Sequence, residues 1–170
     1  MNKDTITMQL PKGYTTKVSA QDYPVLSKHK WRAEENKGYT RVSGYANGKK
    51  VTMARFILGA TESNVFVDHI DCDPLNNTRD NLRLATPKEN ARNCSKKSAG
   101  VPTSRYKGVA WHSRDQRWRT SIEVDGKKIW LGQFHTEIEA AIRYNNAARQ
   151  HYGEFAYLNQ IPRGVELFGV

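Results

Sequence analysis

The sequence predicts an α+β protein. An N-terminal β-rich segment leads into a strand-strand-helix (ββα) unit, and a three-stranded antiparallel sheet packed on one helix follows. Short runs of alternating apolar and polar residues, which are typical of half-buried strands, recur beside Asn-Gly and Asp-Gly dipeptides. Apolar residues at helical spacing continue over several turns in residues 137–151. These observations indicate short strands joined by tight turns and a long helix near the C-terminus.

The N-terminal third is predicted to be rich in β-structure. Residues 39–45 and 50–53 alternate on either side of Asn47-Gly48, and this dipeptide favours a tight hairpin because both residues tolerate a positive φ. Residues 55–58 are expected to form a short helical turn closed by Gly59, since glycine readily adopts the left-handed conformation that ends a helix.

Residues 67–90 bring together side chains suited to acid-base and metal chemistry. Asp68 and His69 end an apolar strand, Asn81 opens a second strand 12 residues after His69, and Asn90 follows nine residues later. Hydrolysis of a phosphodiester needs a base that activates water and a hard cation that absorbs charge on the phosphate. An imidazole beside a carboxylate and amide oxygens can supply both, so this segment is a candidate nuclease site.

The backbone signals in this segment favour a loop and then a helix. Asn76 and Asn77 are interpreted as turn residues, because asparagine tolerates left-handed backbone and forms local turns. Residues 86–89, Thr-Pro-Lys-Glu, have the form of a capping box, with Thr as N-cap and Pro at the first helical position. Asn90 is therefore expected in the first turn of a helix, with its amide pointing back toward the first strand.

This order and spacing resemble the ββα-metal nucleases of the HNH type, in the variant where the last His is Asn. The resemblance implies that His69 is the general base for an attacking water and that Asn81 orients His69. It also implies that Asp68 and Asn90 hold one divalent cation, Mg²⁺ with Mn²⁺ as an alternative, since both ligands offer oxygen atoms.

The sequence pattern of residues 104–159 predicts a second module. Residues 107–112, 117–124 and 127–134 alternate as three strands, Asp125-Gly126 is a hairpin turn, and residues 137–151 can cover one face of the sheet. In the second strand, alternation places Arg117, Arg119, Ser121 and Glu123 on one side and Trp118, Thr120, Ile122 and Val124 on the other, toward the helix.

The motifs Tyr106-Lys107-Gly108-Val109, Trp130-Leu131-Gly132-Gln133-Phe134 and Glu139-Ala140-Ala141 resemble the plant ethylene-response-factor (AP2/ERF) DNA-binding domain. The resemblance implies that the open sheet face enters the major groove, where arginine can read guanine edges. The expected DNA-binding residues are Lys96, Lys97, Arg105, Lys107, Arg117, Arg119, Lys128 and Trp130. The arginines that plant members carry in the first strand are replaced by Ala110 and His112, so the base preference of the plant proteins does not transfer.

The charge balance favours a polyanionic partner. The chain has 27 Lys and Arg against 17 Asp and Glu, a net charge of +10 and a pI near 9.7, so duplex DNA is the expected partner. Neither a membrane-spanning run nor an export signal is recognisable, which leads us to expect a cytoplasmic protein. The first 60 residues resemble the N-terminal part of phage and mobile-element proteins that join the same modules, and this resemblance implies the host cell of such an element. Cys72 and Cys94 lie outside any Cys-x-x-Cys pair and are expected to be reduced thiols.

The sequence thus predicts an N-terminal β region and nuclease domain at 1–95, with its core at 61–95. A basic linker at 96–104, a DNA-binding domain at 105–160 and a tail at 161–170 follow. The expected function is site-specific, homing-endonuclease-like cleavage of duplex DNA by a monomer that nicks one strand. A catalytically inactive DNA-binding regulator and an RNA-binding protein are the alternatives.

Overall fold

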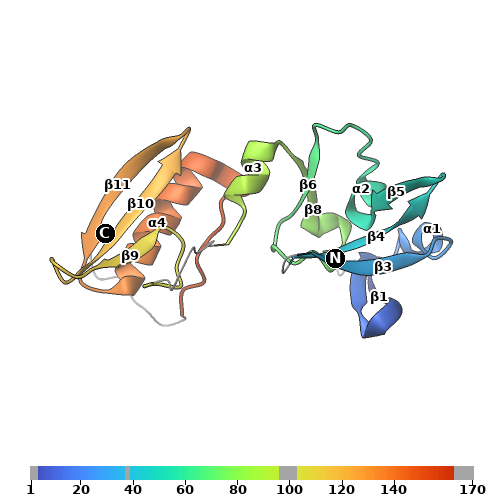
Figure 1. The fold of residues 1–170 in the computed structure, drawn as a ribbon, viewed down its shortest axis with the longest axis horizontal. Helices are drawn as coiled ribbons and strands as arrows, with labels where there is room; N and C mark the ends of the chain where they lie inside the picture. Colours follow the sequence, from blue (N-terminus) through green and yellow to red (C-terminus); the bar gives the residue numbers. More distant parts are fainter. Residues whose placement is uncertain (1–3, 37–38, 96–102, 163–170) are drawn as a thin grey trace. The chain divides into compact units, whose positions relative to one another are not determined.

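The chain folds into two compact units, Met1–Ala91 (unit 1) and Arg92–Val170 (unit 2). The computed structural model describes residues 4–36, 39–95 and 103–162 (Figure 1). Most of the predicted linker, the end of the predicted tail, and both Lys96 and Lys97 lie outside these described residues. Within the described ranges, no helix is both long and apolar enough to cross a bilayer.

Unit 1 is built mainly from short strands. They are β1 (Thr5–Gln9), β2 (Thr15–Ser19), β3 (Trp31–Asn36), β4 (Tyr39–Ala46), β5 (Lys49–Thr52), β6 (Phe66–His69), β7 (Asn76–Asn77) and β8 (Leu82–Ala85). Strand β2 pairs with β1 and, in parallel, with β7, whereas β4 lies between β3 and β5 and β6 pairs with β8. The helices are α1 (Tyr23–Leu26), α2 (Met53–Leu58) and α3 (Pro87–Arg92), with 3-10 turns at Pro11–Gly13 and Arg79–Asn81.

The predicted turns in the N-terminal third are confirmed. Asn47 and Gly48 both have positive φ and connect β4 to β5. Helix α2 ends at Gly59, whose φ is 63°. It begins two residues before the predicted turn, because the Thr52 hydroxyl accepts a hydrogen bond from the Arg55 amide and caps it there.

Unit 1 has a core to which separate segments contribute. Val18, Leu26 and Met53, from β2, α1 and α2, are almost completely buried, and Trp31 and Val42 pack against them from the β3–β4–β5 sheet. Burying aliphatic side chains of this size contributes about 1.5–3 kcal/mol each. Leu82 of β8 belongs to the same core and Val67 of β6 packs against it, so the core also anchors the β6–β8 hairpin.

Unit 2 consists of a three-stranded antiparallel sheet and one long helix. Its elements are β9 (Val109–His112), β10 (Arg117–Val124), β11 (Lys127–Phe134), α4 (Glu137–Tyr152) and a 3-10 turn at Gly153–Phe155. The strand order is β11-β10-β9, and Figure 1 shows α4 against one face of the sheet. Buried Val109 and Ile122 contact alanines and Tyr144 of α4. The predicted inward face of β10 is confirmed by Thr120 and Ile122, which are buried.

The first strand of unit 2 is shorter than the sequence predicts. It begins at Val109 rather than at residue 107, because Gly108 has a φ of 76° and leaves the extended conformation. A Cβ at Gly108 would lie 2.0 Å from a Tyr144 ring carbon, so the tight approach to α4 requires glycine there.

The pairing of β10 with β11 contains a β-bulge. Thr120 lies opposite Gly132 but Ser121 lies opposite Trp130, so Leu131 is an extra residue. As a result Trp130 points to the open face and is 56% exposed, whereas Phe134 lies opposite Trp118 and packs into the core.

Candidate functional site

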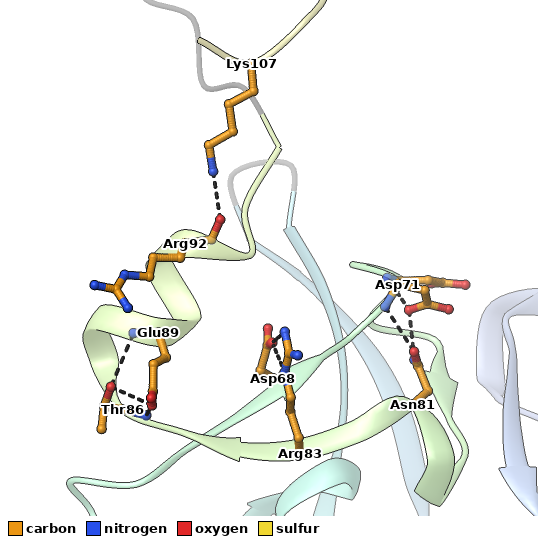
Figure 2. A network of polar contacts seen from close by, with 9 residues as sticks. Asp68, Asp71, Asn81, Arg83, Thr86, Glu89, Arg92 and Lys107 are labelled. Carbon is orange, nitrogen blue, oxygen red and sulfur yellow. Dashed lines mark hydrogen bonds and ion pairs between the residues drawn. The ribbon is translucent and has the colours of Figure 1, made fainter. Parts of the chain in front are cut away.

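The β6–β8 hairpin holds a buried ion pair. Asp68 and Arg83 face each other across the two strands, and Arg83 donates two hydrogen bonds to Asp68 Oδ2, at 2.8 and 2.7 Å (Figure 2). The side chains of Arg83 and Asp68 are only 11% and 6% exposed. A buried carboxylate is costly without a counter-charge, so Arg83 secures the position of Asp68. The sequence interpretation missed Arg83, although the strand register places it directly opposite Asp68.

His69 is held from a strand distant from β6 in sequence. Its Nε2 lies 3.2 Å from Oδ1 of Asn77, which is 1% exposed. The Asn77 Nδ2 donates to Thr16 Oγ1 at 3.0 Å and to the Pro74 carbonyl at 3.2 Å. These acceptors fix the Asn77 amide with its oxygen toward His69, so a hydrogen on Nε2 of the imidazole would be donated to that oxygen. Asn77 was interpreted as a turn residue, and it is instead the partner that positions the imidazole.

The Asn81 side chain fixes the loop that follows His69. Its Oδ1 accepts from the Asp71 amide at 3.0 Å, and its Nδ2 donates to Asp71 Oδ1 at 2.8 Å (Figure 2). The same Nδ2 also donates to the Asn76 carbonyl at 2.8 Å. Burial raises the pKa of Asp71, but hydrogen bonds from Asn76, Asp73 and Asn81 outweigh it and the pKa is lowered. Asn81 lies in a 3-10 turn just before β8 rather than opening that strand.

Asn90 lies in the first turn of α3, as the helix signal predicts. The capping box is formed: the Thr86 amide donates to Glu89 Oε2 at 2.8 Å, and the Glu89 amide donates to Thr86 Oγ1 at 3.2 Å (Figure 2). Asn90 is half-buried, and its backbone N–H donates a hydrogen bond to the Thr86 carbonyl at 3.0 Å. The cap therefore fixes the first turn of α3, in which Asn90 lies.

The donor set of this site consists of hard oxygen atoms. Among the described residues no three His, Cys, Asp or Glu side chains gather as a metal-binding group, so a cation here would take one carboxylate, one amide oxygen and water. Mg²⁺ is typically bound by one or two carboxylates and keeps several waters. Asp68 and Asn90 therefore fit Mg²⁺ better than zinc, which prefers nitrogen and sulfur ligands.

In unit 2 the expected DNA-binding residues of β10 and β11 share the open sheet face. Arg119, Lys128 and Trp130 line a hollow of about 350 Å³ on that face, together with Ala110 and His112 of β9 and other residues of the sheet. The Arg119 guanidinium lies 5.7 Å from the centre of the Trp130 ring and forms an ion pair with Asp115. Arg117 stands on the same side of β10, where it donates to the Gln116 carbonyl at 3.0 Å.

The other two expected DNA contacts of unit 2 lie elsewhere. Lys107 precedes β9, and its ammonium donates to the carbonyls of Arg92 and Cys94 at 2.8 and 2.6 Å (the bond to Arg92 is drawn in Figure 2). The Arg105 guanidinium donates to the Tyr106 hydroxyl at 2.9 Å. Lys107 therefore has two backbone partners within unit 2, and its expected contact with DNA stays a prediction.

Comparisons with known proteins find a nuclease family over the segment that carries the candidate site. A family described as HNH endonuclease matches residues 48–92, which include Asp68, His69, Asn81 and Asn90. Protein 3.8 of Escherichia phage T7 is 35% identical over 100 residues, which cover 58% of this chain and 78% of the phage protein. Dehydration-responsive element-binding protein 2C of Arabidopsis thaliana is 35% identical over 85 residues, covering 46% of this chain and 24% of the plant protein. No solved structure matches significantly.

The longest of these similarities is to a viral nuclease. An HNH endonuclease of Acanthamoeba polyphaga mimivirus is 37% identical over 158 residues, which cover 88% of this chain and 77% of the viral protein. With similarity along most of both chains, and with the family match over the hairpin and helix that carry the candidate site, this chain belongs to the HNH endonuclease family.

Proposed function

We propose that this protein is a site-specific, homing-endonuclease-like enzyme that hydrolyses phosphodiester bonds in duplex DNA. The observation that carries the proposal is the arrangement at the end of β6, where Asp68 has a fixed buried counter-charge and the adjacent His69 has a fixed imidazole. A general base must keep one orientation to take a proton from an attacking water. The network around Asn77 provides that constraint.

His69 is the general base in this proposal. With Nε2–H donated to Asn77 Oδ1, Nδ1 is the ring atom that takes the proton of the attacking water. The imidazolium that forms keeps its bond to the Asn77 oxygen, which also stabilises the positive charge. Asn81 keeps the loop after His69 closed, and thereby limits the positions that the ring can adopt.

Asp68 and Asn90 would hold a divalent cation, Mg²⁺ or Mn²⁺, which when bound would neutralise charge on the scissile phosphate. Arg83 anchors Asp68 through Oδ2 and keeps the carboxylate oriented. The capping box of Thr86 and Glu89 anchors the turn that presents Asn90. Each proposed ligand therefore has a neighbour that fixes it, as in metal sites whose outer partners orient the ligands.

Unit 2 is the proposed DNA-binding module, of the AP2/ERF type. Its open face carries Arg117, Arg119, Lys128 and Trp130 on β10 and β11, and β-ribbons can enter the major groove. The similarity to a plant protein named as a response-element-binding protein supports the same role. The proposed partner is duplex DNA in the cell that hosts the phage or mobile element.

The decisive test is the cleavage activity of His69→Ala. Purified protein is first incubated with genomic DNA and Mg²⁺, and the new DNA ends are mapped to find the cleavage site. The cleavage rates of wild type and variant are then compared on DNA that carries this site. The variant should cleave about 10²–10⁴-fold more slowly because water loses its base, while its DNA affinity stays near that of wild type. His151→Ala, on the exposed side of α4, is the matched control and should cleave normally. Binding without cleavage by the wild type would favour an inactive DNA-binding regulator.

The proposed product is a nick. The described residues contain one His69-centred site, and duplex strands are antiparallel, so one site with a fixed orientation addresses one strand. Supercoiled plasmid that carries the site should pass through open circles before linear DNA appears. Direct conversion to linear DNA at limiting enzyme would contradict the monomeric, nicking mechanism.

A further inference from the structure

The β3–β4–β5 sheet of unit 1 has one face in the core and one face open. Trp31 and Val42 are buried on the inner face, where α2 packs. Residues opposite each other in an antiparallel sheet project to the same side, so the strand register defines the outer face. Its described members are Arg32, Glu34, Tyr39, Arg41, Ser43, Tyr45, Lys50 and Thr52, which we call the outer face of unit 1.

Positive charge is in excess on this outer face. Glu34 accepts ion pairs from Lys50 at 2.8 Å, Arg32 at 3.0 Å and Arg41 at 3.4 Å. The Lys50 ammonium is the main cause that lowers the pKa of Glu34 to about 2, so the carboxylate is ionised near neutral pH. Three cations around one anion leave a surplus of two positive charges, and the three basic side chains are still 44–57% exposed.

The same face has a recess and exposed tyrosines. Arg41, Ser43, Lys50 and Thr52 line a hollow of about 240 Å³, together with Val51 and Arg55. Tyr39 and Tyr45 are 57% and 60% exposed. Arginine, lysine, serine, threonine and tyrosine side chains are the groups that contact the phosphates and sugars of DNA without reading the bases.

We propose that the outer face of unit 1 binds the sugar-phosphate backbone of duplex DNA, as a second contact surface besides the sheet of unit 2. The charge surplus suits a polyanion, and the exposed phenol groups of Tyr39 and Tyr45 suit phosphate oxygens. The inference rests on the proposed function for the identity of the polyanion. The contact adds affinity and no base preference, because nothing in its chemistry depends on a base edge.

The test uses two variants of the full chain that change the surplus charge in opposite directions. Arg41→Gln/Lys50→Gln brings the outer face to neutrality, since Arg32 and Glu34 then balance. Each lost phosphate contact should make the slope of log K against log salt shallower by about 0.9, or about 1.8 for the pair, which weakens binding at 0.1 M salt by up to about 60-fold. Glu34→Gln raises the surplus to three charges and should tighten binding several-fold.

Lys28→Gln/Lys30→Gln is the matched control, since it also removes two charges of exposed lysines in unit 1 but outside the outer face. It should change the salt slope much less than Arg41→Gln/Lys50→Gln. Thermal unfolding checks that every variant is folded. Opposite effects of the double variant and Glu34→Gln on affinity would support the proposal, because a purely structural ion cluster predicts lower stability and unchanged DNA binding.

Three results would overturn the inference. The first is an unchanged salt slope in Arg41→Gln/Lys50→Gln, with wild-type cleavage intact; the proposed function would then stand and only the second surface would fail. The second is an equal effect of the Lys28 and Lys30 control. The third is that Arg41→Gln/Lys50→Gln loses affinity for duplex RNA alone, when duplex RNA and duplex DNA of one sequence are compared. If the wild type neither binds nor cleaves DNA, the proposed function fails and the inference fails with it.

Discussion

Replacing Arg83 with methionine tests the ion pair that holds Asp68. The change keeps most of the side-chain volume but removes both hydrogen bonds to Asp68 Oδ2, and it leaves a carboxylate whose side chain is only 6% exposed. Removing one partner of a buried ion pair costs about 3–5 kcal/mol. In a domain of about 90 residues each kcal/mol shifts the unfolding midpoint by about 4–8 °C, so unit 1 should unfold at least about 12 °C lower.

The assay is thermal unfolding monitored by circular dichroism, with hydrogen exchange used to identify the transition of unit 1. A double-mutant cycle with Asp68→Asn isolates the interaction. Because the double variant buries no uncompensated charge, it should recover most of the stability that Arg83→Met loses. Arg79→Met is the control: its partner Asp22 lies 2.8 Å away, but the Arg79 side chain is 41% exposed, so its loss should be clearly smaller.

Divalent cations should distinguish the variant from the wild type. In Arg83→Met the carboxylate of Asp68 has lost its guanidinium, so a bound cation supplies the missing counter-charge, and added Mg²⁺ should raise the midpoint more than in wild type. Asp68→Asn/Arg83→Met should show little response. A loss below about 1 kcal/mol in Arg83→Met, the size of an exposed pair, would refute the reasoning, as would a double variant no more stable than Arg83→Met.

Three further predictions concern stability. Gly108→Ala should destabilise unit 2 by about 3 kcal/mol or more on thermal unfolding, because the new Cβ would clash with Tyr144. Gly126→Ala is the control: Gly126 has the same φ of 76° but open space around it, so this variant should lose less stability. Glu34 has a pKa of about 2 against 4.5 unperturbed, so its stabilising contribution is present above pH 4.5 and lost as the pH falls toward 2; Glu34→Gln should show a smaller midpoint drop over that range. Lys107→Met should lower the stability of unit 2 by about 1.5–3 kcal/mol on thermal unfolding, since two hydrogen bonds to a charged group are lost.

Local signals predicted much of the secondary structure. The Asn47-Gly48 turn, the cap of α3 and the strands β10 and β11 depend on residues within a few positions of one another, and each was recognisable without tertiary contacts. The exceptions have local causes that sequence patterns hide. Gly108 occupies a left-handed conformation within an apparently alternating run, and Asn81 ends a 3-10 turn where the start of a strand was expected.

The partners of the candidate site depend on long-range contacts. Asn77 acquires its role through Thr16, 61 residues earlier in the chain, by the parallel pairing of β2 and β7. Two parallel strands are not joined by a tight turn, so no local sequence pattern connects Thr16 with Asn77. Arg83 was accessible in principle, since the β6–β8 register follows once both strands are known. The assignments of His69, Asn81, Asp68 and Asn90 to catalysis and metal binding remain predictions for the experiments above.

The extra residue in β11 limits how this protein can be re-engineered. Trp130 and Phe134 are four positions apart, and in a regular strand they would project to the same side. Leu131 shifts the alternation by one residue, so that one aromatic ring is available to a partner while the other completes the interior. A strand grafted from a relative without the insertion would turn one of these rings to the wrong side. Exchange of recognition strands should therefore succeed only between sequences that keep the same spacing.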